Sequence, residues 1–97
     1  MRLDRYLFFI RPVKSRTLAQ GVIESGTVRI DGRRVAKPAE EVQVGTVISL
    51  PLHGNVRVVR VVALPNRRGP ASEARTCYEE IDEASDSANV SQQGGGD

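Results

Sequence analysis

Hydrophobic residues near the start of the chain recur with the spacing of an amphipathic helix. The apolar positions that follow the i, i+3, i+4, i+7 pattern are Leu3, Tyr6, Leu7 and Ile10. The pattern predicts a helix over residues 2–11, which Pro12 ends because the residue before a proline disfavours the helical conformation. Phe8 lies off this stripe, between Arg5 and Arg11. Its ring is either a stacking platform for a nucleic-acid base or a packing partner within the protein.

A second helical pattern follows after a short gap. Ser15 or Thr17 can accept a hydrogen bond at the helix N-cap, and Thr17 with Gln20 has the spacing of a capping box. The residues expected on the apolar side of this helix are Leu18, Ala19, Val22 and Ile23. Gly26 stands where a left-handed C-cap would end it. The chain therefore predicts a second amphipathic helix that stops before Gly26.

A β-hairpin is predicted directly after this helix. Val28 and Ile30 alternate with Arg29 ahead of Asp31-Gly32, a dipeptide typical of type I′ turns. With a two-residue turn, the opposed pairs are Ile30 with Arg33, Val28 with Val35 and Arg29 with Arg34. Two arginines directly opposite each other repel. The face that carries them is either simply solvated or suited to holding an anion.

The second half of the chain predicts further strands. Residues 44–50 and 56–64 are rich in β-branched residues, and they flank a turn predicted over residues 51–55. Gly45 is the steric requirement of the turn that leads into the first of these strands. The alternation breaks near Val58-Val59, so we expect either a bulge there or a strand that is buried on both faces.

A short helix and a tail are predicted to complete the chain. Pro70 suits the first position of a helix, whose apolar side would consist of Ala71, Ala74, Tyr78 and Ile81. Residues 83–97 are polar, glycine-rich and acidic, which predicts disorder. The predicted fold is α+β, with two N-terminal helices packed on a small, mainly antiparallel sheet. We expect a domain at residues 1–64, a basic loop and C-terminal helix at 65–82, and a disordered tail at 83–97.

Charge is distributed unevenly along the chain. Residues 1–75 hold all 14 Lys and Arg residues against six acidic ones, whereas the last 22 residues hold six acidic residues and no basic one. Such a basic body indicates a polyanionic partner. Nucleic acid is favoured over a membrane, because no basic amphipathic helix or lipidation signal is visible. The basic side chains expected to form one cationic surface are Arg5, Arg11, Lys14, Arg16, Arg29, Arg33, Arg34 and Lys37.

Candidate catalytic and metal-binding residues are sparse. His53 has no cysteine or histidine at metal-ligand spacing, and Cys77 has no histidine at a spacing that suggests nucleophilic catalysis. Packing as a small hydrophobic residue is the favoured role of Cys77. We therefore expect a non-enzymatic protein without a cofactor or metal. The single cysteine fits a reducing compartment, and the apolar run at residues 6–10 is too short for a signal peptide, so a cytoplasmic location is expected.

Four segments in the first half of the chain resemble the alpha-L RNA-binding motif, the domain type named after ribosomal protein S4. They read Arg-Leu-Asp at 2–4, Lys-Ser-Arg-Thr-Leu-Ala at 14–19, Gly-Thr-Val-Arg-Ile-Asp-Gly at 26–32 and Val-Gly-Thr-Val-Ile at 44–48. Residues 66–74 and 78–80 are similar to the segment that follows this motif in the bacterial heat shock protein 15 family. Members of that family bind the large ribosomal subunit when it carries a stranded nascent chain on tRNA.

The resemblance implies that the partner is structured RNA, either rRNA or tRNA held on the large ribosomal subunit. Carried over position by position, the contacts fall on Arg11, Lys14, Ser15, Arg16, Arg29, Arg33 and Arg34. DNA is a less favoured partner, because the pattern predicts no long recognition helix for a major groove. The chain departs from the family at Thr46, where an acidic residue is usual, and in its acidic tail, where some members carry a basic extension.

Two functions are compatible with these features. The first is a non-enzymatic RNA-binding module that aids the rescue or recycling of stalled ribosomal subunits during stress. The alternative is a detached RNA-targeting subunit of an RNA-modifying enzyme, because the same motif occurs fused to pseudouridine synthases and aminoacyl-tRNA synthetases. The acidic run that begins at Glu79 either competes with RNA for the basic surface or only keeps the protein soluble.

Overall fold

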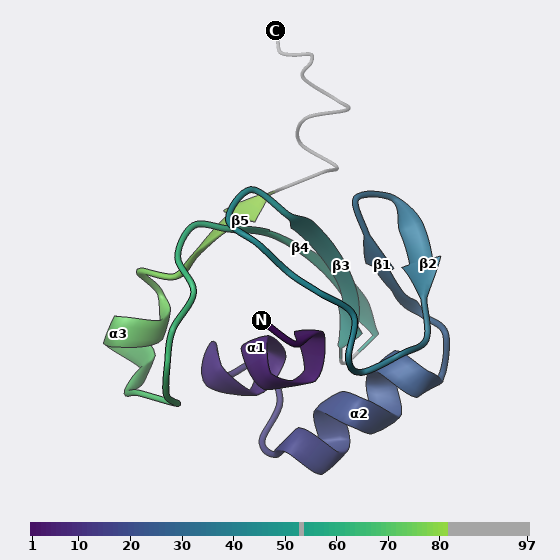
Figure 1. The fold of residues 1–97 in the computed structure, drawn as a ribbon, viewed down its shortest axis with the longest axis horizontal. Helices are drawn as coiled ribbons and strands as arrows, with labels where there is room; N and C mark the ends of the chain where they lie inside the picture. Colours follow the sequence, from purple (N-terminus) through teal and green to yellow (C-terminus); the bar gives the residue numbers. More distant parts are fainter. Residues whose placement is uncertain (53, 82–97) are drawn as a thin grey trace, which may run out of the picture.

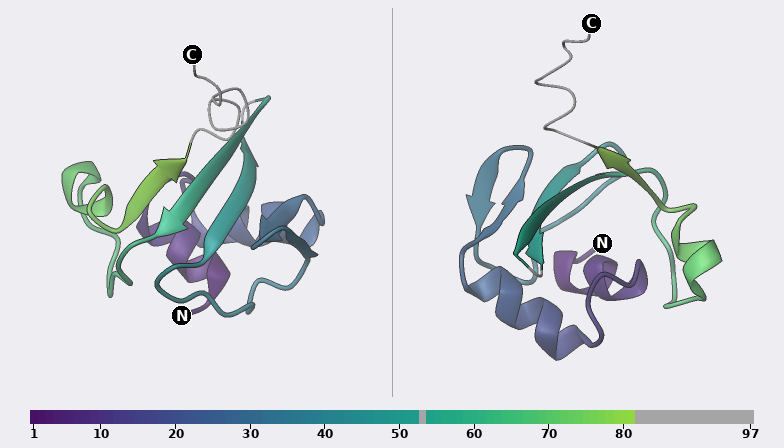
Figure 2. Two further views of the ribbon diagram at one scale, coloured as in Figure 1. Left: turned by 90° about the horizontal axis from the view of Figure 1, so that it is seen from above. Right: turned by 180° about the vertical axis from the view of Figure 1, so that it is seen from behind.

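The computed structural model of the chain describes residues 1–52 and 54–81. Its elements are α1 (Leu3–Phe9), α2 (Arg16–Glu24), β1 (Val28–Ile30), β2 (Arg33–Val35), β3 (Val47–Leu52), β4 (Asn55–Val61), α3 (Ala71–Ala74) and β5 (Tyr78–Ile81). The strands form one antiparallel sheet in the order β2-β1-β3-β4-β5. Helices α1 and α2 lie on the same side of this curved sheet, as Figures 1 and 2 show.

This architecture confirms the predicted α+β class, including the two N-terminal helices and a short C-terminal helix. The predicted disordered tail at residues 83–97 lies outside the described residues, as does His53. None of the described helices has the length and apolar character needed to cross a membrane.

Helix α1 is held at its start by another part of the chain. Arg2 gives no side-chain cap. Instead, the amides of Leu3 and Asp4 donate to the carbonyls of Glu40 and Pro38, at 2.8 and 3.1 Å. The predicted apolar stripe is correct, since all four of its residues are buried. The segment at residues 37–41 therefore satisfies amide groups that a helix start leaves without an intrahelical partner.

Helix α2 begins as predicted, with Ser15 rather than Thr17 as its N-cap. The Ser15 hydroxyl accepts a hydrogen bond from the Leu18 amide at 3.1 Å. Ala19 and Ile23 are completely buried, but the side chain of Leu18, expected on the apolar side, is 53% exposed. The expectation for Leu18 is wrong because only a narrow strip of this helix contacts the rest of the domain.

The hairpin has the predicted register. Val28 pairs with Val35, Arg29 with Arg34 and Ile30 with Arg33. Asp31 and Gly32 form the turn with positive φ angles of 52° and 83°. Asp31 also ties this turn to β3, since its backbone amide donates to the Val47 carbonyl at 2.7 Å and its Oδ1 accepts from the Val47 amide at 2.9 Å.

The pairing of β3 with β4 decides whether the strand contains a bulge near Val58-Val59 or is buried on both faces. Its register is constant from the Val47–Arg60 pair to the Leu52–Asn55 pair, so this ladder contains no bulge. Val58 and Val59 are both buried, which confirms the alternative of a strand buried on both faces. The turn predicted over residues 51–55 is wrong in its extent, because Pro51 and Leu52 belong to β3. A proline is tolerated there because β1 pairs with β3 only at residues 48 and 49.

The predicted C-terminal helix is present, but it is too short to include all the residues expected on its apolar side. Helix α3 stops at Ala74, and Tyr78 and Ile81 belong to strand β5, which pairs with β4. The long edge of β4 offers unpaired backbone groups, and this ladder satisfies them. The acidic residues of β5 also meet basic partners on β4: Glu79 lies 2.7 Å from Arg60, and Glu80 lies 2.9 Å from Arg57.

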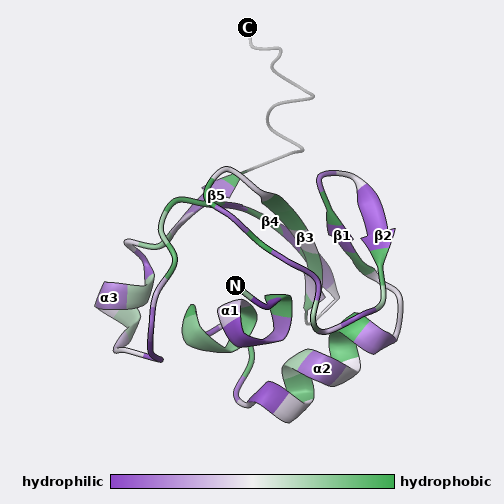
Figure 3. Ribbon diagram, viewed as in Figure 1, coloured by the Kyte–Doolittle hydropathy of each residue, from purple (hydrophilic) through white to green (hydrophobic). Residues whose placement is uncertain are grey.

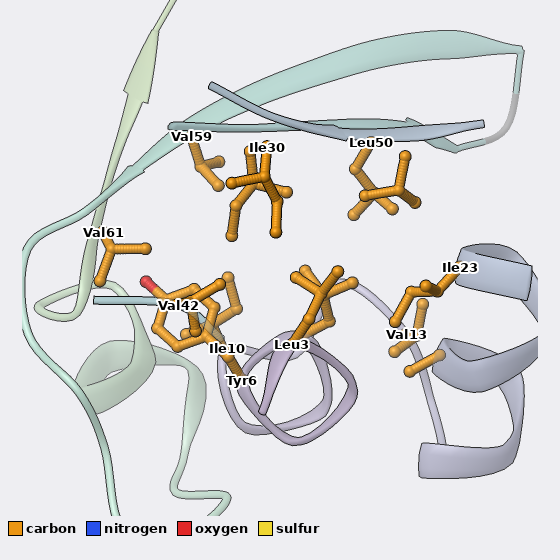
Figure 4. Close-up of a cluster of buried hydrophobic side chains, with 14 of the residues drawn as sticks. Leu3, Tyr6, Ile10, Val13, Ile23, Ile30, Val42, Leu50, Val59 and Val61 are labelled. Atoms are coloured by element: carbon orange, nitrogen blue, oxygen red, sulfur yellow. The ribbon is translucent and has the colours of Figure 1, made fainter. Parts of the chain in front are cut away.

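The core fills the space between the two N-terminal helices and the facing side of the sheet. Figure 4 shows Leu3 and Tyr6 from α1, with Ile10 directly after this helix, opposite sheet residues that include Ile30 and Val59. The Tyr6 hydroxyl donates to the carbonyl of Cys77 at 2.8 Å, and burial raises the pKa of Tyr6. Cys77 packs in this core, as predicted.

Replacing Gly32 with valine should destabilise the hairpin. A Cβ atom at this position would meet no atom within 4 Å, so the loss would come from backbone conformation alone. Left-handed geometry disfavours an L-residue by about 1–2 kcal/mol, and a β-branched side chain more strongly. Urea denaturation of Gly32→Val should show a loss of about 2 kcal/mol. Gly32→Asn is the matched control, because asparagine tolerates this region; equal losses in both variants would contradict the predicted cause.

Candidate nucleic-acid interface

A buried carboxylate, Asp4, joins the starts of α1 and α2. Its Oδ1 accepts hydrogen bonds from Arg2 Nε at 3.0 Å and from the Arg5 amide at 2.7 Å. Its Oδ2 accepts from Arg2 Nη2 at 3.1 Å and Gln20 Nε2 at 3.0 Å, and it lies 3.5 Å from Arg16 Nη2. The side chains of Arg2 and Arg16 remain 46% and 42% exposed. Asp4 thus holds two guanidinium groups at the surface of the protein.

Asp4 is ionised in spite of its burial. Burial raises the pKa of this carboxyl group, but the hydrogen bonds from Arg2, Gln20 and the Arg5 amide lower it by more. The pKa of Asp4 therefore falls from 3.8 to about 2. Its negative charge is fully present at neutral pH, which keeps the two guanidinium groups in place.

The sequence analysis did not identify Arg2, Asp4 and Gln20 as parts of the site. One signal was available: Arg16 and Gln20 stand four residues apart on a predicted helix and so share one face of it. The burial of Asp4 depends on how α1 packs against α2, and no local pattern reports that packing.

The segment at residues 37–41 contacts both the start of α1 and strand β2. Its backbone carbonyls hold the start of α1, which places the exposed Lys37 close to Asp4 in the fold. Arg33 Nη2 lies 3.5 Å from Glu40 Oε1, so β2 is connected to the same segment. The Arg33 side chain remains 63% exposed.

Arg29 and Arg34 lie side by side on the face of the sheet that points away from the helices. They are paired across the hairpin and exposed, whereas their neighbours Val28 and Ile30 are buried. Beside Arg29 is a hollow of about 390 Å³, whose other lining residues are Thr27, Gly32, Ser49, Pro51 and Val56. Figure 3 shows the hydrophilic character of β2.

The basic side chains of the candidate interface are carried by two parts of the fold. The helix-start group consists of Arg2, Lys14 and Arg16, and the hairpin group consists of Arg29, Arg33 and Arg34. Helix α2 connects the two parts, because its first turn carries Arg16 and its far end leads into β1 (Figure 1). Nine helical residues span about 13 Å. Ser15 serves as the N-cap of α2, so its hydroxyl already accepts a backbone hydrogen bond.

Arg5 and Arg11 are exposed, and Arg5 contacts Asp4 through its backbone amide. Arg11 has a left-handed φ of 79°, and its Nη1 donates to the carbonyl of Gly69 at 2.7 Å. Its guanidinium group is therefore held by the loop that precedes α3.

Arg68, which belongs to that loop, donates hydrogen bonds on both sides of the turn between α1 and α2. Arg68 Nε donates to the Phe8 carbonyl at 3.1 Å, and Arg68 Nη2 donates to the Val13 carbonyl at 3.4 Å. The Arg68 guanidinium carbon also lies 4.7 Å from the centre of the Phe8 ring. Of the two roles predicted for Phe8, the structure shows the packing partner within the protein. The role of Arg68 was missed, because only the fold brings residues 8 and 68 together.

Across residues 1–52 and 54–81, no group of three or more His, Cys, Asp or Glu side chains is arranged to bind a metal ion.

A small antiparallel sheet covered by two helices, with basic side chains at the helix start and on the hairpin, defines an S4 domain, and the chain matches the family model of the S4 domain over residues 1–48. It is 39% identical over 84 residues to heat shock protein 15 of Escherichia coli, covering 87% of this chain and 62% of that protein. It is 35% identical over 65 residues to the RQC P-site tRNA stabilizing factor of Helicobacter pylori, covering 67% of this chain and 76% of that protein.

The fold agrees with a solved structure. Trimeric heat shock protein 15 of Vibrio cholerae aligns with a TM-score of 0.81 at 30% identity, over 95% of this chain and 96% of that chain. The chain belongs to the heat shock protein 15 family of S4-domain proteins. It spans 62% of the length of the Escherichia coli relative.

Replacing Asp4 with asparagine should lower stability in a pH-dependent way. The folded-state pKa of Asp4 is about 2 against 3.8 ordinarily, so between these values the unfolded state binds more protons and stability falls with falling pH. Urea denaturation above pH 4 should show a loss of about 1–3 kcal/mol in Asp4→Asn.

The difference between Asp4→Asn and the wild-type protein should shrink as the pH falls from about 4 to about 2. Glu24→Gln, on the exposed side of α2, controls for the loss of one negative charge. A difference that stays constant over this range would show that Asp4 does not act as an ion.

Proposed function

We propose that this protein binds structured RNA on the large ribosomal subunit, without catalysis, and acts in the rescue or recycling of stalled subunits. The observation that carries the proposal is the pair of cationic groups held on a rigid frame. Asp4 orients Arg2 and Arg16, and the hairpin ladder orients Arg29 and Arg34. Phosphate contacts supply most of the affinity of such an interface, and they need basic side chains at fixed positions.

The names of the relatives support the same proposal. The Helicobacter pylori relative is a P-site tRNA stabilizing factor, and its name points to tRNA on the ribosome. RNA is also favoured over DNA by the size of the helices, since α2 has nine residues and no other described helix is longer. Short elements can follow the phosphates of a bent RNA strand, whereas DNA recognition commonly places a helix in the major groove.

The first experiment tests the partner. The protein should sediment with purified large ribosomal subunits at low salt and be released as the potassium chloride concentration rises. Co-purification from cells with a catalytic polypeptide, and no sedimentation with subunits, would favour the detached targeting subunit of an RNA-modifying enzyme.

The second experiment tests the hairpin group. Arg34→Ala should weaken binding to large subunits and lower the slope of log affinity against log salt by about 0.7–0.9, the value of one lost phosphate contact. Its melting temperature should hold or rise slightly, because the substitution removes the repulsion between Arg29 and Arg34. Arg67→Ala is the matched control, since Arg67 is paired with Glu73 away from both groups. An Arg34→Ala variant with the wild-type slope would remove this residue from the interface.

Lys14→Ala gives the cleaner test of the helix-start group. Arg16 contacts Asp4, so Arg16→Ala would alter both the domain frame and any RNA contact. Lys14 is exposed, and its replacement should lower the salt slope by about 0.7–0.9 while the unfolding free energy stays unchanged.

A further inference from the structure

A cationic hollow lies where the turn after α1 meets the C-terminal part of the domain. It has a volume of about 240 Å³, and it is lined by Arg11, Arg57, Arg75 and Tyr78 together with three apolar neighbours. Its arginines come from separate parts of the chain: Arg11 from the turn after α1, Arg57 from β4 and Arg75 from the end of α3. Of these three, only Arg11 belongs to the cationic surface that the sequence predicts.

Positive charge in this hollow exceeds negative charge. Arg57 is paired with Glu80 through two hydrogen bonds, at 2.9 and 3.0 Å. Arg11 donates to the Gly69 carbonyl, which is neutral. Arg75 is exposed, and the described part of the chain gives it no ion pair within 4 Å. Three guanidinium groups thus face one carboxylate, and their repulsion would be relieved by an added anion.

The walls of the hollow are formed before any ligand binds. Arg11 holds a left-handed backbone conformation, which in a residue other than glycine persists only where the surrounding structure fixes it. Arg68 fixes the same turn through the carbonyls of Phe8 and Val13. On the other side, the ladder of β4 with β5 positions Tyr78. Binding therefore requires little reorganisation of the backbone.

The chemistry of the lining selects a phosphate group. A guanidinium group offers a planar fork of donors that matches the oxygens of a phosphate, and several such groups around one anion add charge to this geometry. The hollow is small and open, which suits one phosphate of a chain that continues past it. Arg11 places it next to the turn that leads to Lys14 and the helix-start group.

We propose that this hollow binds one backbone phosphate of the RNA, so that the RNA passes from the helix-start group across the turn after α1 to β4 and β5. This inference rests on the proposed function and adds Arg57 and Arg75 to its interface. Arg75 supplies a charge without a partner in the described structure, and Arg57 supplies a guanidinium already oriented by Glu80.

Arg75→Ala tests the inference on RNA. Binding to large ribosomal subunits should weaken, and the salt slope should fall by about 0.7–0.9, while the melting temperature stays unchanged. Arg75→Lys should keep the salt slope but bind less tightly, because it retains the charge and loses the donor fork. Arg67→Ala, in the loop before α3 and paired with Glu73, should match the wild type.

A second measurement tests the hollow without the ribosome. Inorganic phosphate, titrated into the full chain and followed by NMR, should shift the Nε–H signals of Arg57 and Arg75 at low millimolar concentration. These shifts should be lost at Arg57 in Arg75→Ala and kept in Arg67→Ala. In the wild type and in Arg75→Ala, the signal of Arg67 serves as the internal reference for general effects of ionic strength.

The outcomes separate this inference from the proposed function. Wild-type binding to subunits together with a wild-type salt slope in Arg75→Ala would overturn the hollow and leave the proposed function standing. If the protein bound neither large subunits nor rRNA, both the proposed function and the phosphate site in the hollow would be wrong. A uniform response of all arginine signals to phosphate would overturn the hollow as an anion site.

Discussion

The burial of one charge, on Asp4, constrains the geometry of the whole N-terminal half of this protein. A buried carboxylate is tolerated only where donors surround it, and here the donors come from α1, from α2 and from the residue that precedes α1. Helices α1 and α2 cannot slide or rotate against each other without breaking this set. The orientation of Arg2 and Arg16 at the surface is therefore a consequence of core packing.

The C-terminal third of the domain is fixed by contacts of a different kind. Strand β5 completes the sheet, and its two acidic residues are neutralised by Arg57 and Arg60. Arg11 and Arg68 cross between the loop before α3 and the turn after α1, where each donates to backbone carbonyls. Two residues of the acidic run that begins at Glu79, Glu79 itself and Glu80, are thus already engaged within the sheet. The turn after α1 is consequently held from both sides.

Local patterns predicted most of the N-terminal half of the fold. The stripe of α1, the cap at Ser15, the stop at Gly26 and the register of the hairpin each depend on neighbours within a few residues. The extent of β3 and the strand at Tyr78–Ile81 depend on which edges the sheet leaves open, and the sequence around each segment does not carry that information.

The candidate site, like the fold, was predictable where its contacts are local and unpredictable where they are tertiary. The basic residues of the hairpin were identified because their pairing is local, whereas the clustering of Arg2, Asp4 and Gln20, and the meeting of Arg11 with Arg57 and Arg75, arise from tertiary packing. Charge composition reported that a cationic surface exists. It did not report which elements of the fold would carry these side chains.

Strand β2 forms one edge of the sheet, and this position gives Arg33 and Arg34 a second effect. An open edge can template the addition of a strand from another copy of the protein, which leads to aggregation. Here the edge is only three residues long and carries two exposed arginines, so a second β2 laid against it would meet like charges. The same side chains that we propose to contact RNA thus also oppose edge-to-edge association of the free protein.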